Sequence, residues 1–192
     1  MNYSNILQQI QADERYHRNL KWGSPRQGHP EGTIRAHIEE LEQNLETLRP
    51  LLRDGEEEQL RLLIHVHDTF KPDAQRGVSI THPKSHSSLA RAFLAEYCPQ
   101  SDLLNIVQYH DEPYALWRQH YFQGQANEER YHQLLNTIES WDLFHVFLII
   151  DGCTNGKSRL PLEWWFAKTA SAVESRFSAK HLIAVQAETN SL

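Results

Sequence analysis

The chain has 192 residues but only two cysteines, Cys98 and Cys153, which lie far apart and form no CxxC pair. Neither a zinc knuckle nor a disulfide framework is therefore expected. Long apolar runs are also missing, because the longest, Val146–Ile150, is far shorter than the roughly 20 residues of a membrane-spanning helix. The opening residues, MNYSNILQQIQADER, lack the apolar core of a signal peptide. We therefore expect a cytoplasmic protein without membrane association.

Basic residues are scarce as well: 19 Lys and Arg stand against 25 Asp and Glu, which gives a net charge of −6. A mildly acidic protein has no general attraction for nucleic-acid backbones. Extended nucleic-acid binding is therefore not expected, and an anionic ligand must be bound locally. No repeat, low-complexity tract or flexible linker divides the chain. Its length suits one domain, and its 40% of hydrophobic residues excludes wholesale disorder.

The strong sequence patterns have the helical period, and they predict an all-α, single-domain helical bundle. The clearest pattern is an amphipathic helix from Ile34 to about Pro50, with Thr33 as its N-cap. The longest helix is predicted over Glu128–Ile150 and the last over Leu162–Phe177. The remaining helices of the domain are predicted over about 56–68, 89–97, 103–110 and 114–122.

These patterns divide the chain into three segments. Residues 1–28 hold an N-terminal helix and an approach segment, residues 29–183 form the helical domain, and residues 184–192 form a tail. Within the domain, the polar stretch 69–85 contains prolines and a glycine and separates two predicted helices. We interpret this stretch as an active-site loop.

Histidine is unusually frequent, with 12 residues in the chain. Its imidazole is a good metal ligand when neutral, and it titrates near pH 7. Mixed imidazole and carboxylate ligands suit transition-metal ions better than calcium, and a helical bundle can bring such side chains together. Several predicted helices begin, turn or end on these residue types, at His37, His67-Asp68, His86, His110-Asp111 and Asp151. Taken singly, each of these residues is more often a structural residue than a metal ligand, so their combined order decides the interpretation.

The order of these residues resembles the HD-domain superfamily of metal-dependent phosphohydrolases. The defining set in this chain is His37, the adjacent pair His67-Asp68, and Asp151. The segment Gly28–Ile34, which leads into the helix of His37, is also similar to the opening of many such domains. The resemblance covers residues 29–152, about two thirds of the chain, and it implies an HD-like fold.

The resemblance also implies a binuclear metal site. Family members that bind two ions have two more histidines between the His-Asp pair and the final aspartate, and His86 and His110 lie in this interval. The implied ligands of the first ion are His37, His67, Asp68 and Asp151. The implied ligands of the second ion are Asp68, His86 and His110. One or two ions of manganese, iron, cobalt, nickel or zinc are expected, and magnesium is less favoured because so many ligands are imidazoles.

Three positions leave alternatives open. His82 lies one helical turn before His86, which we favour because an apolar helical face follows it. Asp142 and Asp151 lie nine residues apart on one predicted helix, so their side chains point in opposite directions and at most one faces the site. We favour Asp151 because it is at the helix end. Asp111 stands where many binuclear members have a histidine. Three roles stay open for it: a metal ligand, a partner that orients an imidazole, or an acid at a helix end without a role in the site.

The resemblance assigns catalytic roles to Asp68 and Lys71. In the family, the aspartate of the His-Asp pair bridges the two ions, which gives this role to Asp68. Many members carry a lysine three residues later that contacts the substrate phosphate, and Lys71 has this position, although Phe70 replaces the family's glycine. Weaker candidates for binding an anion are Arg76, Lys84 and Lys157.

The activity that the resemblance implies is hydrolysis of a phosphate ester by metal-activated water, with a nucleotide or another small phosphorylated metabolite as the substrate. Two alternatives share the same ligand set. Some HD-domain proteins hold two irons and oxidise organophosphonates or polyols with dioxygen. A non-catalytic HD protein would bind a nucleotide without turning it over.

Overall fold

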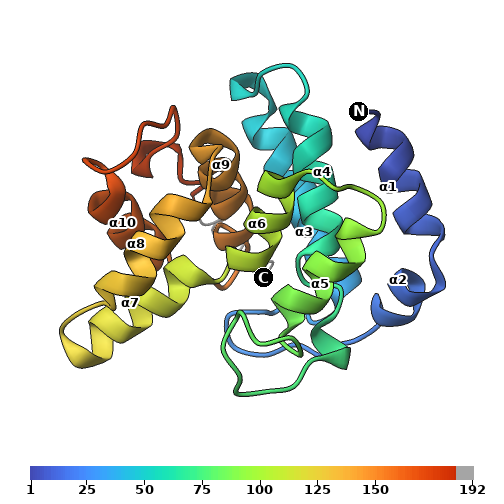
Figure 1. The fold of residues 1–192 in the computed structure, drawn as a ribbon, viewed down its shortest axis with the longest axis horizontal. Helices are drawn as coiled ribbons and strands as arrows, with labels where there is room; N and C mark the ends of the chain where they lie inside the picture. Colours follow the sequence, from blue (N-terminus) through green and yellow to red (C-terminus); the bar gives the residue numbers. More distant parts are fainter. Residues whose placement is uncertain (185–192) are drawn as a thin grey trace, which may run out of the picture.

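The computed structural model describes residues 1–184, and their regular structure is helical (Figure 1). Within these residues there is no β-strand, only two isolated bridges, and the predicted all-α class is confirmed. The predicted tail falls, apart from residue 184, outside the described residues. The α-helices are α1 Tyr3–Ala12, α2 Glu14–Asn19, α3 Ile34–Leu48, α4 Glu56–Val66, α5 His86–Ala95, α6 Ser101–Tyr109, α7 Glu112–Gln123, α8 Glu128–Thr137, α9 Trp141–Gly152 and α10 Leu160–Thr169. The short 3-10 helices are η1 Arg49–Leu51, η2 Lys71–Asp73 and η3 Ala179–His181.

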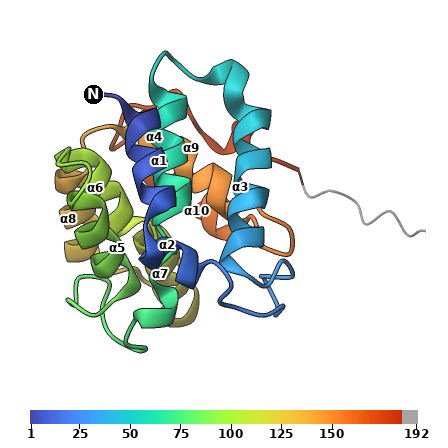
Figure 2. The same cartoon turned by 90° about the vertical axis from the view of Figure 1, so that its right-hand side faces the viewer.

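Helices α4 and α9 pack against each other in the middle of the bundle, and α3 packs on both of them. Figure 2 shows α1 in front of α4, with α3 on one side and the pair α5 and α6 on the other. Helices α7, α8 and α10 form the left-hand end of the molecule in Figure 1, opposite to α1 and α2. There α10 packs on α7, and α8 packs on α6. In the described part of the chain, no helix has the length and apolar character needed to cross a bilayer.

One apolar core runs through the bundle, from Ile10 in α1 to Phe177 beyond α10. Helix α4 turns Leu60, Leu63 and Ile64 into this core, and all three are fully buried. Helix α3 begins as the sequence predicts, because the hydroxyl of Thr33 accepts the backbone N–H of Ala36 at 3.2 Å. This apolar packing places the ends of several helices side by side.

The prediction of a single helix over Glu128–Ile150 is wrong, because the chain forms two helices, α8 and α9, with an extended residue between them. Ile138 has φ −85° and ψ 127° and is buried. The carboxylate of Asp102 in α6 accepts the backbone N–H groups of Glu139 and Ser140, both at 3.0 Å. The apolar period continues across the break, so the sequence pattern does not reveal it. A distant carboxylate supplies the hydrogen bonds that a continuous helix would have made.

The last helix is also shorter than predicted, because α10 ends at Thr169 and not at Phe177. The chain beyond α10 is fixed by tertiary contacts. The backbone N–H and the guanidinium of Arg176 donate to Asp142 at 2.7 and 2.6 Å, and Phe177 is buried in the core. The apolar side chains that suggested a helix therefore pack from an irregular segment.

The role of Asp102 at the helix break leads to a stability prediction. Asp102→Ala removes the acceptor for two backbone N–H groups, and we expect it to lower the free energy of unfolding by about 1–2 kcal/mol, measured by urea denaturation. Asp54→Ala, at an exposed position, is the matched control and should change it by less than about 0.5 kcal/mol. An equal effect of the two substitutions would contradict this account of the break.

His145 predicts how stability depends on pH. Its ring is buried against Trp141 and Phe166, and neither ring nitrogen has a hydrogen-bond partner in residues 1–184. Burial lowers its pKa from 6.5 to about 4. Between these values the unfolded chain binds a proton that the folded chain does not, so stability falls as the pH is lowered from 7 to 4. In urea denaturation at several pH values, His145→Leu should lose less stability over this range than the parent protein does; an unchanged pH dependence would contradict the assignment.

Candidate metal centre

Six side chains from five helices converge at one place in the bundle. His67 and Asp68 follow the last turn of α4, and His110 follows that of α6. The other three lie in helices near an end: His37 in the first turns of α3, His86 as the first residue of α5, and Asp151 next to the last residue of α9. The core packing of these helices therefore brings together residues that are far apart in the sequence.

The first group consists of His37, His67, Asp68 and Asp151. His37 Nε2 lies 3.1 Å from Asp151 Oδ1 and 3.8 Å from Asp68 Oδ2. His67 Nε2 lies 3.5 Å from Asp68 Oδ2 and 3.9 Å from Asp151 Oδ1. Ligands at about 2.0–2.2 Å from a metal ion are separated from one another by about 3–3.5 Å. The group is therefore close to the spacing that one ion requires.

The second group consists of Asp68, His86 and His110. Asp68 Oδ1 lies 3.7 Å from His86 Nε2 and 3.6 Å from His110 Nε2, and the two imidazole nitrogens are 3.4 Å apart. Asp111 Oδ2 lies 3.2 Å from His86 Nε2 and 3.8 Å from His110 Nε2, so this acid also faces the second group. Asp68 thus presents one oxygen to each group of histidines.

Three buried atoms in this cluster lack a hydrogen-bond partner within residues 1–184, namely His37 Nδ1, His67 Nε2 and Asp68 Oδ1. A buried polar atom without a partner is costly, and such atoms in native proteins call for a specific explanation. His67 Nδ1 lies 3.1 Å from the carbonyl oxygens of Leu63 and Ile64, so a proton on Nδ1 directs the lone pair of Nε2 toward the cluster. The cluster can therefore hold a metal ion.

The charges around the cluster are balanced. Lys71 forms an ion pair with Asp68, and Lys157 Nζ lies 2.8 Å from Asp151 Oδ1. Burial acts to raise the pKa values of Asp68 and Asp151, but the two lysines and the neighbouring imidazoles hold them well below the ordinary value. Both carboxylates are therefore ionised at neutral pH and suited to bind a cation.

The two histidines nearest to Asp68 have different proton affinities. Burial lowers the pKa of His67 to about 4, so its imidazole is neutral at pH 7. Burial also acts to lower the pKa of His110, but the charges of Asp111 and Asp68 raise it to about 9. An ion bound at His110 Nε2 would therefore displace a proton.

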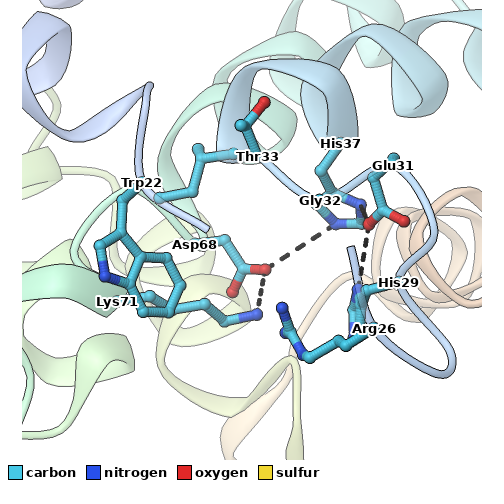
Figure 3. A pocket seen from close by; sticks show the side chains of 10 residues that line it. Trp22, Arg26, His29, Glu31, Gly32, Thr33, His37, Asp68 and Lys71 are labelled. Carbon is cyan, nitrogen blue, oxygen red and sulfur yellow. Dashed lines mark hydrogen bonds and ion pairs between the residues drawn. The ribbon is translucent and has the colours of Figure 1, made fainter. Parts of the chain in front are cut away.

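The sequence analysis missed Glu31, which lies behind His37 (Figure 3). Its Oε1 lies 3.1 Å from His37 Nδ1 and 3.0 Å from His29 Nδ1. Burial acts to raise the pKa of Glu31, but the hydrogen bonds to the two histidines lower it far below its ordinary value. A carboxylate on the far nitrogen of an imidazole fixes the ring orientation and makes it a better ligand. The signal in the sequence was an acid in the turn directly before the helix of His37.

The same turn shows why its glycine is needed. Gly32 has φ +80°, and a Cβ atom there would lie 2.7–2.8 Å from the ring and nitrogen of Pro25. Any other residue would therefore be strained by its backbone conformation and would also clash with Pro25. Glycine at position 32 thus allows the tight turn that places Glu31 beside His37 in α3.

The structure separates the alternatives left by the sequence. His82 lies in the loop before α5, where its Nδ1 accepts the backbone N–H of Lys84, whereas His86 lies in the cluster. Asp142 pairs with Arg176 at the other end of α9, whereas Asp151 lies in the cluster. Among the weaker candidates for binding an anion, only one lines the cavity next to the cluster: it is Lys157, and not Arg76 or Lys84.

The cavity beside the cluster has a volume of about 550 Å³ and reaches Asp68, Asp151 and both lysines. A smaller cleft, drawn in Figure 3, shares His29, Asp68 and Lys71 with it and also contains Arg26. The cavity therefore gives a ligand access to the clustered side chains, whereas the cleft, with a volume of about 20 Å³, has room only for a water molecule.

No protein-family model, curated protein or solved structure matches this chain. The resemblance to HD-domain proteins therefore stays a prediction from the order of His37, His67-Asp68 and Asp151 in the sequence.

The contact behind His37 predicts an effect on metal affinity. Glu31→Gln removes the negative charge that lies 3.1 Å from His37 Nδ1 while keeping the size of the side chain, and we expect metal affinity to fall about 10- to 100-fold. Competition with a chelator of known affinity measures this. Glu39→Gln, at an exposed position in α3, is the control and should leave the affinity unchanged. If both variants bind metal like the parent, Glu31 does not support the site.

Proposed function

We propose that this chain is a metal-dependent phosphohydrolase of the HD type, acting on a nucleotide or another small phosphorylated metabolite. One observation carries the proposal: the buried Asp68 directs its two oxygens at two separate groups of histidines. A carboxylate in this position is suited to bridge two metal ions. The protein as a whole is acidic, so an anionic ligand must be attracted by local positive charges. Lys71 and Lys157 supply such charges beside the cluster.

The residues fit a pair of transition-metal ions. His37, His67, Asp68 and Asp151 would hold the first, and Asp68, His86 and His110 the second. Such ions lower the pKa of bound water, polarise the phosphoryl oxygen and neutralise the charge that develops during transfer. Four imidazoles favour manganese, iron, cobalt, nickel or zinc over magnesium.

Lys71 is the residue best placed to bind the substrate phosphate. It begins η2 three residues after Asp68 and lines both the cavity and the cleft. Burial acts to lower its pKa, but the charges of Asp68 and Asp111 raise it, so Lys71 is charged at neutral pH. Lys157 adds a second positive charge in the cavity, and Arg26 adds one in the cleft.

Asp111 would act as a hydrogen-bond acceptor beside the reacting group. Its side chain is 40% exposed and lines the cavity, while its Oδ2 faces His86. Burial acts to raise its pKa, but the charge of His110 and the hydrogen bond with His86 lower it far below its ordinary value. Asp111 is therefore ionised at neutral pH. It can accept a hydrogen bond or a proton from bound water or substrate, but it has no proton to donate.

The test is metal-dependent phosphate release. The purified protein is reconstituted with each of the five metals and given a panel of nucleotides and phosphorylated metabolites. We expect release with at least one metal, and loss to background in the double variant His67→Ala/Asp68→Ala, because the bridging carboxylate and a histidine are gone. Asp54→Ala is the control and should retain activity.

The same experiment separates the alternatives. Bound iron with oxygen consumption and no phosphate release would contradict the proposed hydrolase activity and favour a di-iron oxygenase. Nucleotide binding without turnover under any metal would favour a non-catalytic HD protein. Absence of metal binding would overturn all of these functions.

A further inference from the structure

The cavity beside the metal centre has an apolar wall that the proposed chemistry does not use. The same space of about 550 Å³ is lined by the charged groups of Asp68, Asp151, Lys71 and Lys157. Its apolar lining consists of Pro113, Tyr114, Trp117, Leu148, Pro161 and Leu162. Asp111 lines the cavity as well, so a phosphate fits there only under the proposed function, in which metal ions offset the carboxylates, and the apolar lining is left for the organic part of the ligand. The volume of the cavity is in the range that accommodates a small organic ligand.

Tyr114 and Trp117 form a stacked pair on this wall. Their ring centroids are 5.6 Å apart and their planes are inclined by 28°. They lie one helical turn apart on the same face of α7, and Tyr114 is 50% exposed. Aromatic rings that remain accessible beside a charged site are suited to stack on a planar ring of a ligand.

Helix α7 holds this pair in a fixed position relative to the metal centre. It begins at Glu112, directly after His110 and Asp111 of the cluster. The buried carboxylate of Glu112 accepts two hydrogen bonds from Arg130 of α8, both at 2.6 Å, and Leu116 is fully buried. A wall anchored in this way loses little conformational freedom when a ligand binds.

We propose that Tyr114 and Trp117 bind the planar ring of the substrate, so that the site selects phosphate esters whose organic part carries an aromatic or heteroaromatic ring and has the size of a nucleoside monophosphate. This inference rests on the proposed function, because it takes the phosphate to lie beside Lys71. Esters of aliphatic alcohols would engage only the charged part of the cavity. Stacking of one base on an aromatic side chain corresponds to about a 5- to 100-fold gain in affinity.

The experiment compares adenosine 5′-monophosphate with ribose 5-phosphate, which has the same sugar and phosphate but no aromatic base. Binding of each radiolabelled ligand, inorganic phosphate included, to the metal-loaded full chain is measured by rapid filtration, which reads binding before turnover and does not depend on the fluorescence of Trp117. We expect the nucleotide to bind about 5- to 100-fold more tightly than ribose 5-phosphate.

Variants locate the effect. Trp117→Ala should remove most of the preference for the nucleotide and leave ribose 5-phosphate binding unchanged, while Trp117→Phe should retain a stacking surface and most of the preference. Phe122→Ala is the matched control, because Phe122 belongs to the same helix and is 72% exposed but does not line the cavity. Circular dichroism checks folding, and Tyr114→Ala replaces Trp117→Ala if that variant does not fold.

Two results would overturn the inference, and they are distinguishable. If the nucleotide and ribose 5-phosphate bind equally, or the preference survives Trp117→Ala, the aromatic wall is not a ring-binding site, and phosphate release can still support the hydrolase. If neither ester nor inorganic phosphate binds, the proposed function fails and this inference fails with it.

Discussion

The carboxylate of Asp68 is buried and ionised, and the surrounding side chains compensate its negative charge. Burial of an isolated carboxylate is costly, so the group must be neutralised, paired or bound to a cation. Here the ammonium group of Lys71 pairs with it, and the imidazoles of four histidines surround it. The helices that deliver these side chains are held by the apolar core and not by the cluster itself. The bundle therefore provides a rigid frame in which several polar groups can be kept close together.

The support for the cluster extends beyond the groups that face it. Glu31 lies behind His37, and backbone carbonyl oxygens lie behind His67 and His110. Each of these contacts uses the nitrogen that points away from the centre. The donor nitrogens are thus oriented before any ion binds, which reduces the cost of forming the site.

The helical class could be predicted from local signals, whereas the set of six clustered side chains was implied by the resemblance of their order to that of a known family. Periodic apolar residues define a helix face, and a His-Asp pair at a helix end is visible in the chain itself. The break at Ile138 could not be predicted in this way, since it depends on Asp102, a carboxylate from α6 that lies far away in the sequence. Glu31 was missed for a related reason: an acid in a loop gains a role only when the fold places it against His37.

The position of the aromatic pair on α7 also could not be predicted from local sequence signals. The spacing of Tyr114 and Trp117 is compatible with a core face or with a solvent-exposed face, and only the cavity shows which side they occupy. Lys71 and Lys157 were already candidates for binding an anion in the sequence. What the sequence does not show is that each lies against a carboxylate of the cluster, Asp68 and Asp151 respectively.

The extended residue between α8 and α9 has a consequence for how the chain tolerates change in length. In one continuous helix, a deletion in α8 would rotate every later side chain by about 100°, and Asp151 would turn away from His37. Because Asp102 anchors the start of α9 independently, the angular position of Asp151 is uncoupled from the length of α8. A deletion in α8 would thus change contacts of that helix, such as the one between Arg130 and Glu112, without rotating Asp151 away from His37.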